Sequence, residues 1–257
     1  MTRRYWNINL QEMMKMSLYM GKKITKRHPN MVPPYICARF KGRYLINLTQ
    51  TARFLSAACD SLFDAARDET GEILFIAPPK PRKITSLITR AARRARCHYI
   101  NSKWLRGMLT NWSTTSNRLI QMRNIRIDQS TGRLARLSKR DAALQKKELA
   151  YLEKHMTGIQ YMERLPAIAI IVDQKQNYLA LRECRLAGIG SICLVDTDCD
   201  PLLADISIPT NTRSLLALRF ILNKFVFAID AGYAQATGPK KRYHTKRSKN
   251  RNLGRPR

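Results

Sequence analysis

The sequence predicts an α/β fold, a three-layer domain in which helices cover both faces of a mostly parallel sheet. Compact apolar runs of strand length occur at Ile73–Ala77, Ala167–Val172 and Ser191–Val195. Stretches with helical spacing of apolar residues lie between and around them. Runs that are apolar throughout, rather than alternating, are typical of parallel strands buried on both sides.

The first part of the chain contributes two helices and two strands in this interpretation. The expected elements are a helix at Ile8–Met20, a basic and proline-containing loop at Gly21–Pro34, a strand at Tyr44–Ile46, a helix from Asn47 or Thr49 to Arg67, and the strand at Ile73–Ala77 between Gly71 and Pro78. In the longer helix, Leu55, Ala58, Leu62 and Ala66 recur at helical spacing.

The second part alternates helices and strands and includes a helical insertion. The expected elements are a helix at Lys83–Arg96, strands at His98–Ile100, Ala167–Val172, Ser191–Val195 and Ile206–Ile208, and helices at Asn177–Ala187 and Ser214–Ala231, with Gly232 ending the globular part. Ser113–Ile127 and Ser138–Met156 are two charged helical stretches around a short turn at Gln129–Gly132. They predict an αα-hairpin that projects from the domain.

The charge of the chain points to a polyanionic partner. Its 257 residues include 47 Lys and Arg against 18 Asp and Glu, which gives a formal net charge of +29. No acid occurs from Ile73 to Ile127, and nine cations without an acid occupy Gly238–Arg257. The chain still carries 29 − 9 = +20 without that tail. Nucleic acid is the favoured partner because cations placed on phosphates release counterions; an anionic membrane surface is the alternative.

Motifs for catalysis or cofactors are weak. Neither GxGxxG after a strand nor GxxxxGK[ST] is present. The carboxylates Asp196, Asp198, Asp200 and Asp205 follow a strand and could hold Mg²⁺, but turn and capping roles are favoured. The six cysteines contain no CxxC pair, so buried thiols are favoured over a cluster of Cys184, Cys193 and Cys199. We therefore expect no cofactor and no metal.

Targeting signals are equally sparse. The first residues lack an apolar signal core, and we expect them to be mature protein without a cleavable transit peptide. The longest apolar runs are too short to span a bilayer. We expect neither a membrane nor a small-molecule substrate as partner.

The stretch Asn101–Trp112 connects a strand to the first helix of the hairpin. Trp104 is either a base-stacking platform or an anchor, and the anchor is favoured because a Trp ring can be buried while its N–H is hydrogen-bonded. Asn111 is expected to cap the following helix. With Gly107, these residues form the predicted structural joint.

The same stretch carries a family resemblance. Trp104–Trp112 resembles the Trp-Leu-Gly-Gly-x-Leu-Thr-Asn signature of the second small-subunit ribosomal protein of bacteria and organelles. Further segments in family order are Ile46–Thr49, Lys139–Ala142, Gly158–Met162, Leu165–Pro166, Ile171–Asp173, Val195–Thr197, Asp200–Pro201 and Asp205–Pro209. The resemblance covers roughly residues 1–232 and is strongest to the land-plant plastid form, through Met1–Leu10, Thr51–Asp60 and Arg94–Tyr99.

The resemblance implies a Rossmann-like domain with an inserted coiled-coil hairpin. It implies a structural place on small-subunit rRNA, between head and body on the solvent side, in a plastid ribosome. Because no cleavable transit peptide is visible, we expect the chain to be organelle-encoded. The implied neighbours are the S-one-type RNA-binding protein and other small-subunit proteins, without catalysis or a nucleotide cofactor. An RNA-modifying or nucleotide-dependent enzyme and a free RNA-binding regulatory factor stay as alternatives.

Several positions depart from the family pattern. The usual His-Phe-Gly-His is Tyr19–Lys22, the first Gly of the signature is Arg106, and an Asn-Asp-Asp run is Asn211–Arg213. Most departures remove an acid, add a cation or add a proline. Compensation for a diverged rRNA and relaxed constraint both fit this pattern.

The predicted division of the chain follows from these elements. Residues 1–112 and 161–232 form the α/β rRNA-binding domain, 113–160 the helical hairpin, and 233–257 a basic tail that is expected to be disordered alone. The predicted phosphate contacts are basic residues from the acid-free tract and the N-terminal loop. They are Lys22, Lys23, Lys26, Arg27, Lys80, Arg82, Lys83, Arg90, Arg93, Arg94, Lys103 and Arg106.

Overall fold

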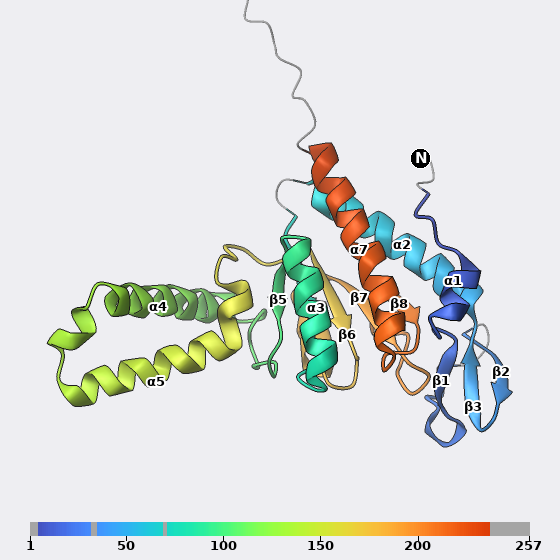
Figure 1. Ribbon diagram of the computed structural model, residues 1–257, viewed down its shortest axis with the longest axis horizontal. Coiled ribbons are helices and arrows are strands. Elements are labelled where there is room, and N and C mark those ends of the chain that lie inside the picture. The colour runs from blue at the N-terminus through green and yellow to red at the C-terminus, as the bar shows by residue number, and fades with distance from the viewer. Residues whose placement is uncertain (1–4, 32–34, 69–70, 237–257) are drawn as a thin grey trace, which may run out of the picture.

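A parallel five-stranded sheet forms the centre of the computed structural model, which describes residues 5–31, 35–68 and 71–236 (Figure 1). Its order is β5-β4-β6-β7-β8. The strands are β4 Ile73–Ile76, β5 His98–Ile100, β6 Ile168–Val172, β7 Gly190–Val195 and β8 Ile206–Pro209. Every neighbouring pair is parallel, with Ile171 opposite Cys193 in the centre. The predicted three-layer α/β architecture with a parallel sheet is confirmed.

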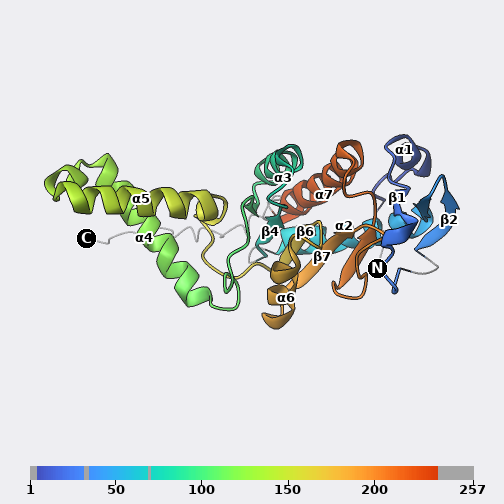
Figure 2. The same cartoon turned by 90° about the horizontal axis from the view of Figure 1, so that it is seen from below.

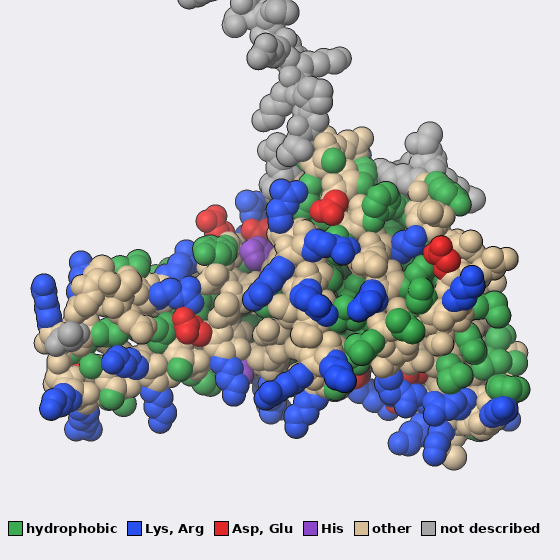
Figure 3. Space-filling view, viewed as in Figure 1, with side chains coloured by type: hydrophobic (Ala, Val, Ile, Leu, Met, Phe, Trp, Pro, Cys, Tyr) green, Lys and Arg blue, Asp and Glu red, His purple; other side chains and the backbone are tan. Residues whose placement is uncertain are grey.

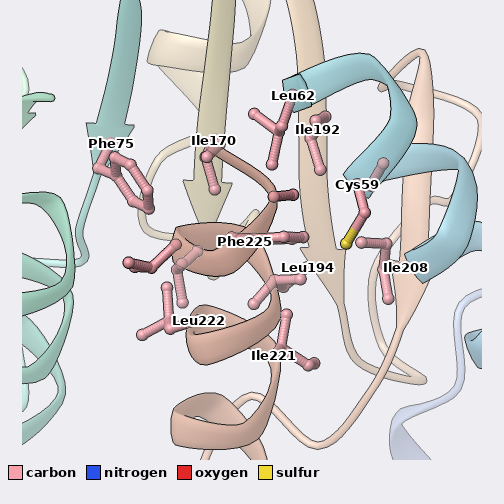
Figure 4. Packing of buried hydrophobic residues seen from close by; sticks show 14 of the residues in the cluster. Cys59, Leu62, Phe75, Ile170, Ile192, Leu194, Ile208, Ile221, Leu222 and Phe225 are labelled. Atoms are coloured by element: carbon pink, nitrogen blue, oxygen red, sulfur yellow. The ribbon is translucent and has the colours of Figure 1, made fainter. Parts of the chain in front are cut away.

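Three long helices cover the first face of this sheet. They are α2 Leu48–Arg67, α3 Arg82–Arg94 and α7 Leu215–Ala236. Phe225 of α7 is fully buried and packs among Leu62 of α2 and the strand residues Ile170 and Ile192 (Figure 4). The apolar stripes that predicted these helices therefore make one continuous core.

The second face has a shorter cover. Helix α6 Tyr178–Leu186 lies on the side opposite α3 and α7 (Figure 2). The connection between β5 and the hairpin packs beside it, and Trp104 and Met108 share a buried cluster with Ile76 and Ile171. Strand side chains thus alternate between the two cores, as expected for a sheet buried on both faces.

The helical hairpin projects from this framework (Figure 1). It consists of α4 Trp112–Ser130 and α5 Lys139–Met156, joined through the short 3₁₀ helix η2 Arg133–Arg136, and is followed by η3 Thr157–Ile159. Leu119 and Met122 of α4 and Leu152 of α5 are buried in a seam that continues into the second core. The predicted hairpin is confirmed, while the division of the chain into separate domains stays a prediction.

The N-terminal segment differs from its prediction. Helix α1 covers only Leu10–Lys15, and Met20–Lys23, expected as helix end and loop, forms strand β1. Ser17 has a φ of 58°, a left-handed conformation that ends the helix. Met20 pairs with Leu45 in a second, antiparallel sheet of order β1-β3-β2. Its other members are β2 Ile36–Phe40, which was not predicted, and β3 Arg43–Ile46; the 3₁₀ helix η1 Ile24–Lys26 follows β1.

The end of the globular part also needs a correction. Gly232 does not end it but lies buried inside α7. A Cβ at Gly232 would lie 2.6 Å from the carbonyl oxygen of Phe63, so this glycine permits close packing of α7 on α2. Most of the predicted basic tail, residues 237–257, lies outside the described residues. Among the described helices, none combines the length and apolar character needed to cross a membrane.

Candidate nucleic-acid interface

Cations follow the carboxyl ends of four strands of the parallel sheet. Lys80 follows β4, Lys103 follows β5, Lys175 follows β6 and Arg213 follows β8. Parallel strands end on the same side of a sheet, so these loops share one border of the molecule. We call this border the carboxyl edge. Lys and Arg side chains gather along the lower border of the α/β part in Figure 3.

A pocket of about 880 Å³ opens on this edge, between β1 and the loops after β6, β7 and β8. Its lining combines seven Lys or Arg side chains with a single carboxylate. These residues are Lys22, Lys23, Lys26, Arg27, Arg43, Lys175 and Arg213, with Asp198 and the neighbouring Thr25, His28 and Pro29. We call it the carboxyl-edge pocket. Its cationic excess suits a ligand that carries several negative charges.

Asp198 ties the two sides of the pocket together. Its Oδ2 lies 2.6 Å from the Nζ of Lys22 on β1 and 2.6 Å from the Nζ of Lys175 after β6. Burial alone would raise the pKa of Asp198, but the two lysines outweigh burial, and the net pKa lies below its usual range. The hydrogen bond to Asp198 in turn raises the pKa of Lys175. Asp198 therefore links Lys22 on β1 to Lys175 after β6 at the wall of the pocket.

Asp196 directly follows β7 and is fully buried. Its Oδ1 accepts the backbone N–H of Thr197 at 2.7 Å, while its Oδ2 is fully buried and finds no hydrogen-bond partner among the residues that the structure describes. Arg213 approaches this oxygen to 3.9 Å. Burial raises the pKa of Asp196, although the Thr197 amide, Lys22 and Arg213 all favour its charged form. Asp196 therefore draws Arg213 toward the pocket without a direct hydrogen bond.

Strand β1 is held against this site by close packing at Gly21. A Cβ there would lie 2.5 Å from the Cγ2 of Thr197. The neighbouring N–H of Lys22 donates to the hydroxyl oxygen of Thr197 at 3.0 Å. The small antiparallel sheet thereby supplies one cationic wall to the edge of the large one.

The other predicted phosphate contacts lie in separate groups. Lys80, Arg82 and Lys83 are exposed where β4 leads into α3, and Arg90, Arg93 and Arg94 are exposed along α3 itself. Arg90 and Arg94 line a hollow of about 420 Å³ together with Arg219 of α7. Lys103 and Arg106 are exposed on the connection to the hairpin. The structure thus brings Lys22, Lys23, Lys26 and Arg27 into one pocket and leaves the remaining eight outside it.

Two arginines of α3 have partners within the chain. Arg93 donates from Nε and Nη2 to the hydroxyl of Tyr99, at 3.1 and 2.7 Å. Arg94 donates to the side-chain oxygen of Asn223 at 3.0 Å. Arg90 is therefore the better placed of the three for a ligand contact.

The predicted joint is built around an acid that the sequence did not reveal. Glu183 of α6 is buried, and its Oε1 accepts the Nε1–H of Trp104 at 3.1 Å and the N–H of Gly107 at 2.8 Å. Its Oε2 accepts the N–H of Leu109 at 3.1 Å. Gly107 adopts a φ of 82°, a left-handed conformation that favours glycine. Trp104 itself is only 5% exposed, which is the geometry of an anchor rather than a base-stacking platform.

Asn111 differs in detail from its expected role. It occupies the N-cap position of α4, but its side chain accepts no backbone N–H. The side-chain oxygen instead accepts the hydroxyl of Ser113 at 3.1 Å. The φ and ψ of Asn111, −114° and 63°, lie outside the extended region that is usual for an N-cap residue.

The remaining polar candidates have structural partners. Asp200 accepts hydrogen bonds from the side chain of Asn30 and the N–H of Leu202, and Asp205 accepts from the N–H and hydroxyl of Ser191. Burial raises the pKa of Cys184 and Cys199 to about 12, which makes both thiols poor nucleophiles. Within residues 5–31, 35–68 and 71–236, no His, Cys, Asp and Glu side chains group closely enough to hold a metal ion.

Sequence reasoning missed Arg43, Lys175, Arg213 and Glu183. Lys175 and Arg213 stand alone in the sequence, outside any run of cations, but each follows shortly after a predicted strand. That position is a usable signal, because it places both on the carboxyl edge. Glu183 interrupts the apolar side of a short helix, and such an acid needs buried donors.

Comparison with known families matches most of this chain to a family model. The model of the family described as "Ribosomal protein S2" matches residues 13–232. The match therefore spans the first helix, both sheets, the hairpin and most of α7.

Proposed function

The chain belongs to the ribosomal protein S2 family, and on that premise we propose that it is a structural, rRNA-binding component of a plastid small ribosomal subunit. Membership makes it a small-subunit ribosomal protein of a non-catalytic family. The proposal adds the plastid setting, the rRNA-binding surface and the residues that form it.

The cationic carboxyl-edge pocket is the observation that carries the rRNA proposal. Lys23, Lys26 and Arg27 are exposed on one side of it, and Arg213 lies on the other. RNA presents closely spaced phosphates, each of which pairs with one Lys or Arg. Lys80 and Lys103 lie on the same edge as the pocket. They are proposed to contact further phosphates of the bound RNA.

The remaining parts receive roles in the same proposal. The predicted contacts on α3 and the joint loop extend the rRNA surface, with Arg90 and Arg106 free to face outward. Trp104 anchors the joint through Glu183, and the hairpin, residues 113–160, reaches away from the α/β domain. The neighbours proposed are the S-one-type protein and other small-subunit proteins.

The plastid setting rests on sequence likeness. Met1–Leu10, Thr51–Asp60 and Arg94–Tyr99 resemble the land-plant plastid form. Residues 13–31 and 35–46, which carry the diverged Tyr19–Lys22 run, fold into elements that pack on the main sheet. The diverged segment thus keeps a structural role here, and its cations line the pocket.

Sedimentation tests the ribosomal part of the proposal. We expect most of the chain to co-migrate with small subunits in a gradient of plastid lysate, and with no other ribosome population in the cell. A chain that stays at the top of the gradient would support a free regulatory factor or an enzyme instead.

A pair of charge reversals tests the rRNA surface. Arg27→Glu places a negative charge in the pocket, whereas Arg67→Glu changes an exposed arginine at the end of α2. We expect Arg27→Glu to weaken binding to small-subunit rRNA by about tenfold and to lower the salt slope by about one, because one phosphate contact is lost. Arg67→Glu should change neither by more than about twofold. Equal effects of the two variants would contradict a localised interface.

A further inference from the structure

A groove of apolar character lies along α6, on the second face of the sheet. It has a volume of about 450 Å³ and is lined by Tyr178, Leu181, Arg182, Arg185, Leu186 and Leu203. Five of these side chains come from one side of α6, since positions 178, 181, 182, 185 and 186 recur at helical spacing. Leu203, from the loop before β8, forms the opposite wall. We call this the α6 groove.

Large apolar side chains are exposed here to an unusual degree. Leu186 is 70% exposed, Tyr178 is 48% exposed, and Leu202, next to the groove wall, is 69% exposed. Single exposed leucines are common on protein surfaces, but a contiguous group around a groove indicates a contact surface. Among the described residues, the α6 groove and the carboxyl-edge pocket have no lining residue in common.

The charge around the groove selects its occupant. Arg182 and Arg185 are exposed on the same stripe as Tyr178 and Leu186. A helix that laid leucines against Leu186 and Leu203 would bring its flanking positions beside these two arginines. Acids at those positions would be paired, whereas lysines would be repelled. RNA fits less well, because phosphates laid against the leucines would lose their own hydration without gaining an apolar contact.

We propose that the α6 groove docks an acidic amphipathic helix of a neighbouring protein in the small subunit. The inference rests on the proposed function, since it places the partner within the same particle, but it uses a different surface from the rRNA contacts. Apolar side chains of the partner, spaced three and four residues apart, fill the groove, and its Asp or Glu side chains pair with Arg182 and Arg185.

Photocrosslinking in assembled subunits tests this proposal. Leu186 is replaced by the photoreactive p-benzoylphenylalanine, and small subunits that contain the variant are isolated and irradiated. Leu216 of α7, 52% exposed, receives the same replacement as a matched control. We expect position 186 to yield a protein–protein product whose attached peptide is net negative and has apolar residues at helical spacing. Position 216 should not give that peptide.

Charge reversal then distinguishes a specific groove from general attraction. Adding Arg182→Glu and Arg185→Glu to the position-186 chain should lower the yield of the product at least fivefold. Binding of purified small-subunit rRNA should change by less than twofold. An RNase-sensitive product, a net basic peptide, no product, the same peptide from position 216, or an unchanged yield after charge reversal would each overturn the proposal. Absence of the chain from small subunits would overturn the proposed function as well.

Discussion

The two faces of the central sheet are stabilised in different ways. On the first face, α2, α3 and α7 bring long apolar stripes onto the strands, and the core is continuous from Phe75 to Ile208. On the second face, one short helix and an irregular connection cover the strands, and the buried Glu183 joins them. Apolar burial is tolerant of small shifts, whereas a carboxylate with three donors fixes the backbone at specific points. The second face therefore combines weaker cover with stricter geometry.

This difference matches what each face does in the proposed function. The first face carries the closing helix and stabilises the domain. The second face positions the hairpin, the joint cations and the α6 groove, all of which face outward to partners. The elements that contact partners in this proposal have fewer helices packed over them, and hydrogen bonds to Glu183 fix their position.

Removing the centre of the first core should have the largest effect. Phe225→Ala deletes a fully buried ring, and we expect the free energy of unfolding to fall by about 3–5 kcal/mol through lost burial and a residual cavity. Urea unfolding followed by circular dichroism measures it. Phe227→Ala, at a position 59% exposed on the same helix, is the control. If both variants lost the same stability, the first face would not be the main core.

Removing the tie of the second face should have a smaller but more local effect. Glu183→Ala leaves the N–H groups of Trp104, Gly107 and Leu109 without their acceptor. We expect a loss of about 3 kcal/mol in the free energy of unfolding, since buried donors are left unpaired. Glu183→Gln keeps one acceptor oxygen and should lose about half of that. Hydrogen exchange should quicken at residues 104–109 before it does in α7; uniform quickening would contradict a local tie.

Elements stabilised by apolar burial could be predicted from the sequence, whereas those positioned by polar contacts to distant residues could not. Ile73–Ala77 and Ala167–Val172 stand out because their runs are apolar throughout and bounded by turn residues. Helices α2 and α7 carry long stripes, so their lengths were predicted closely, apart from the end of α7. In these regions the local pattern and the tertiary structure agree.

Regions whose structure depends on residues far away in the sequence could not be predicted from the local pattern. Strand β1 contains Gly21, Lys22 and Lys23, which have low strand preference, and it forms because β3 and Thr197 pair with it. Strand β2 is mostly exposed and carries no alternating pattern. The role of Glu183 depends on donors more than 70 residues earlier in the chain, at Trp104, Gly107 and Leu109. Four cations of the candidate site were predicted, but the pocket itself required β1 to fold back on the edge.

The carboxyl-edge pocket offers a charged counterpart to the Glu183 tie. Asp198 is held by Lys22 and Lys175, and its pKa lies below the usual range. Because the folded-state pKa is lowered, its contribution to stability is present above the unfolded pKa and is lost as the pH falls through the folded value. We expect Asp198→Asn to remove about 1.5 kcal/mol at pH 7, and the difference from the unmodified chain to shrink progressively as the pH falls below about 4.

Chemical unfolding between pH 3 and pH 7 measures this dependence. Asp64→Asn, which changes an acid half-exposed beside Arg67, supplies the control and should shift stability by about 0.5 kcal/mol or less. A difference for Asp198→Asn that stayed constant across this range would show that the two lysines do not hold the carboxylate charged. In that case the pocket would depend on packing, like the first face.

The smallest effect is expected from the hairpin, whose two helices are joined by a partly exposed ion pair. A variant of this pair tests whether the hairpin unfolds independently of the two faces of the sheet. Arg126 of α4 donates from Nε and Nη2 to Glu153 of α5, at 3.1 and 2.7 Å, and from Nη1 to Gln160 at 2.7 Å. The pair is about 40% exposed on each side, so water competes with it. We expect Arg126→Ala to lower the free energy of unfolding by only about 0.5–1 kcal/mol. Arg123→Ala should have a smaller effect, because the Nε of Arg123 donates to the Leu119 carbonyl oxygen within the same helix.

The measurement that matters here is local. Hydrogen exchange should quicken in α4 and α5 while the exchange of β6 and β7 stays unchanged, because the seam of Leu119, Met122 and Leu152 still holds the two helices together. Exchange that quickened in the sheet as well would mean that the hairpin and the second face unfold as one unit. The hydrogen bonds of Glu183 would then stabilise the hairpin as well as the connection at residues 104–109. The two faces of the sheet would in that case differ in how far their unfolding spreads, and not only in how their cores are packed.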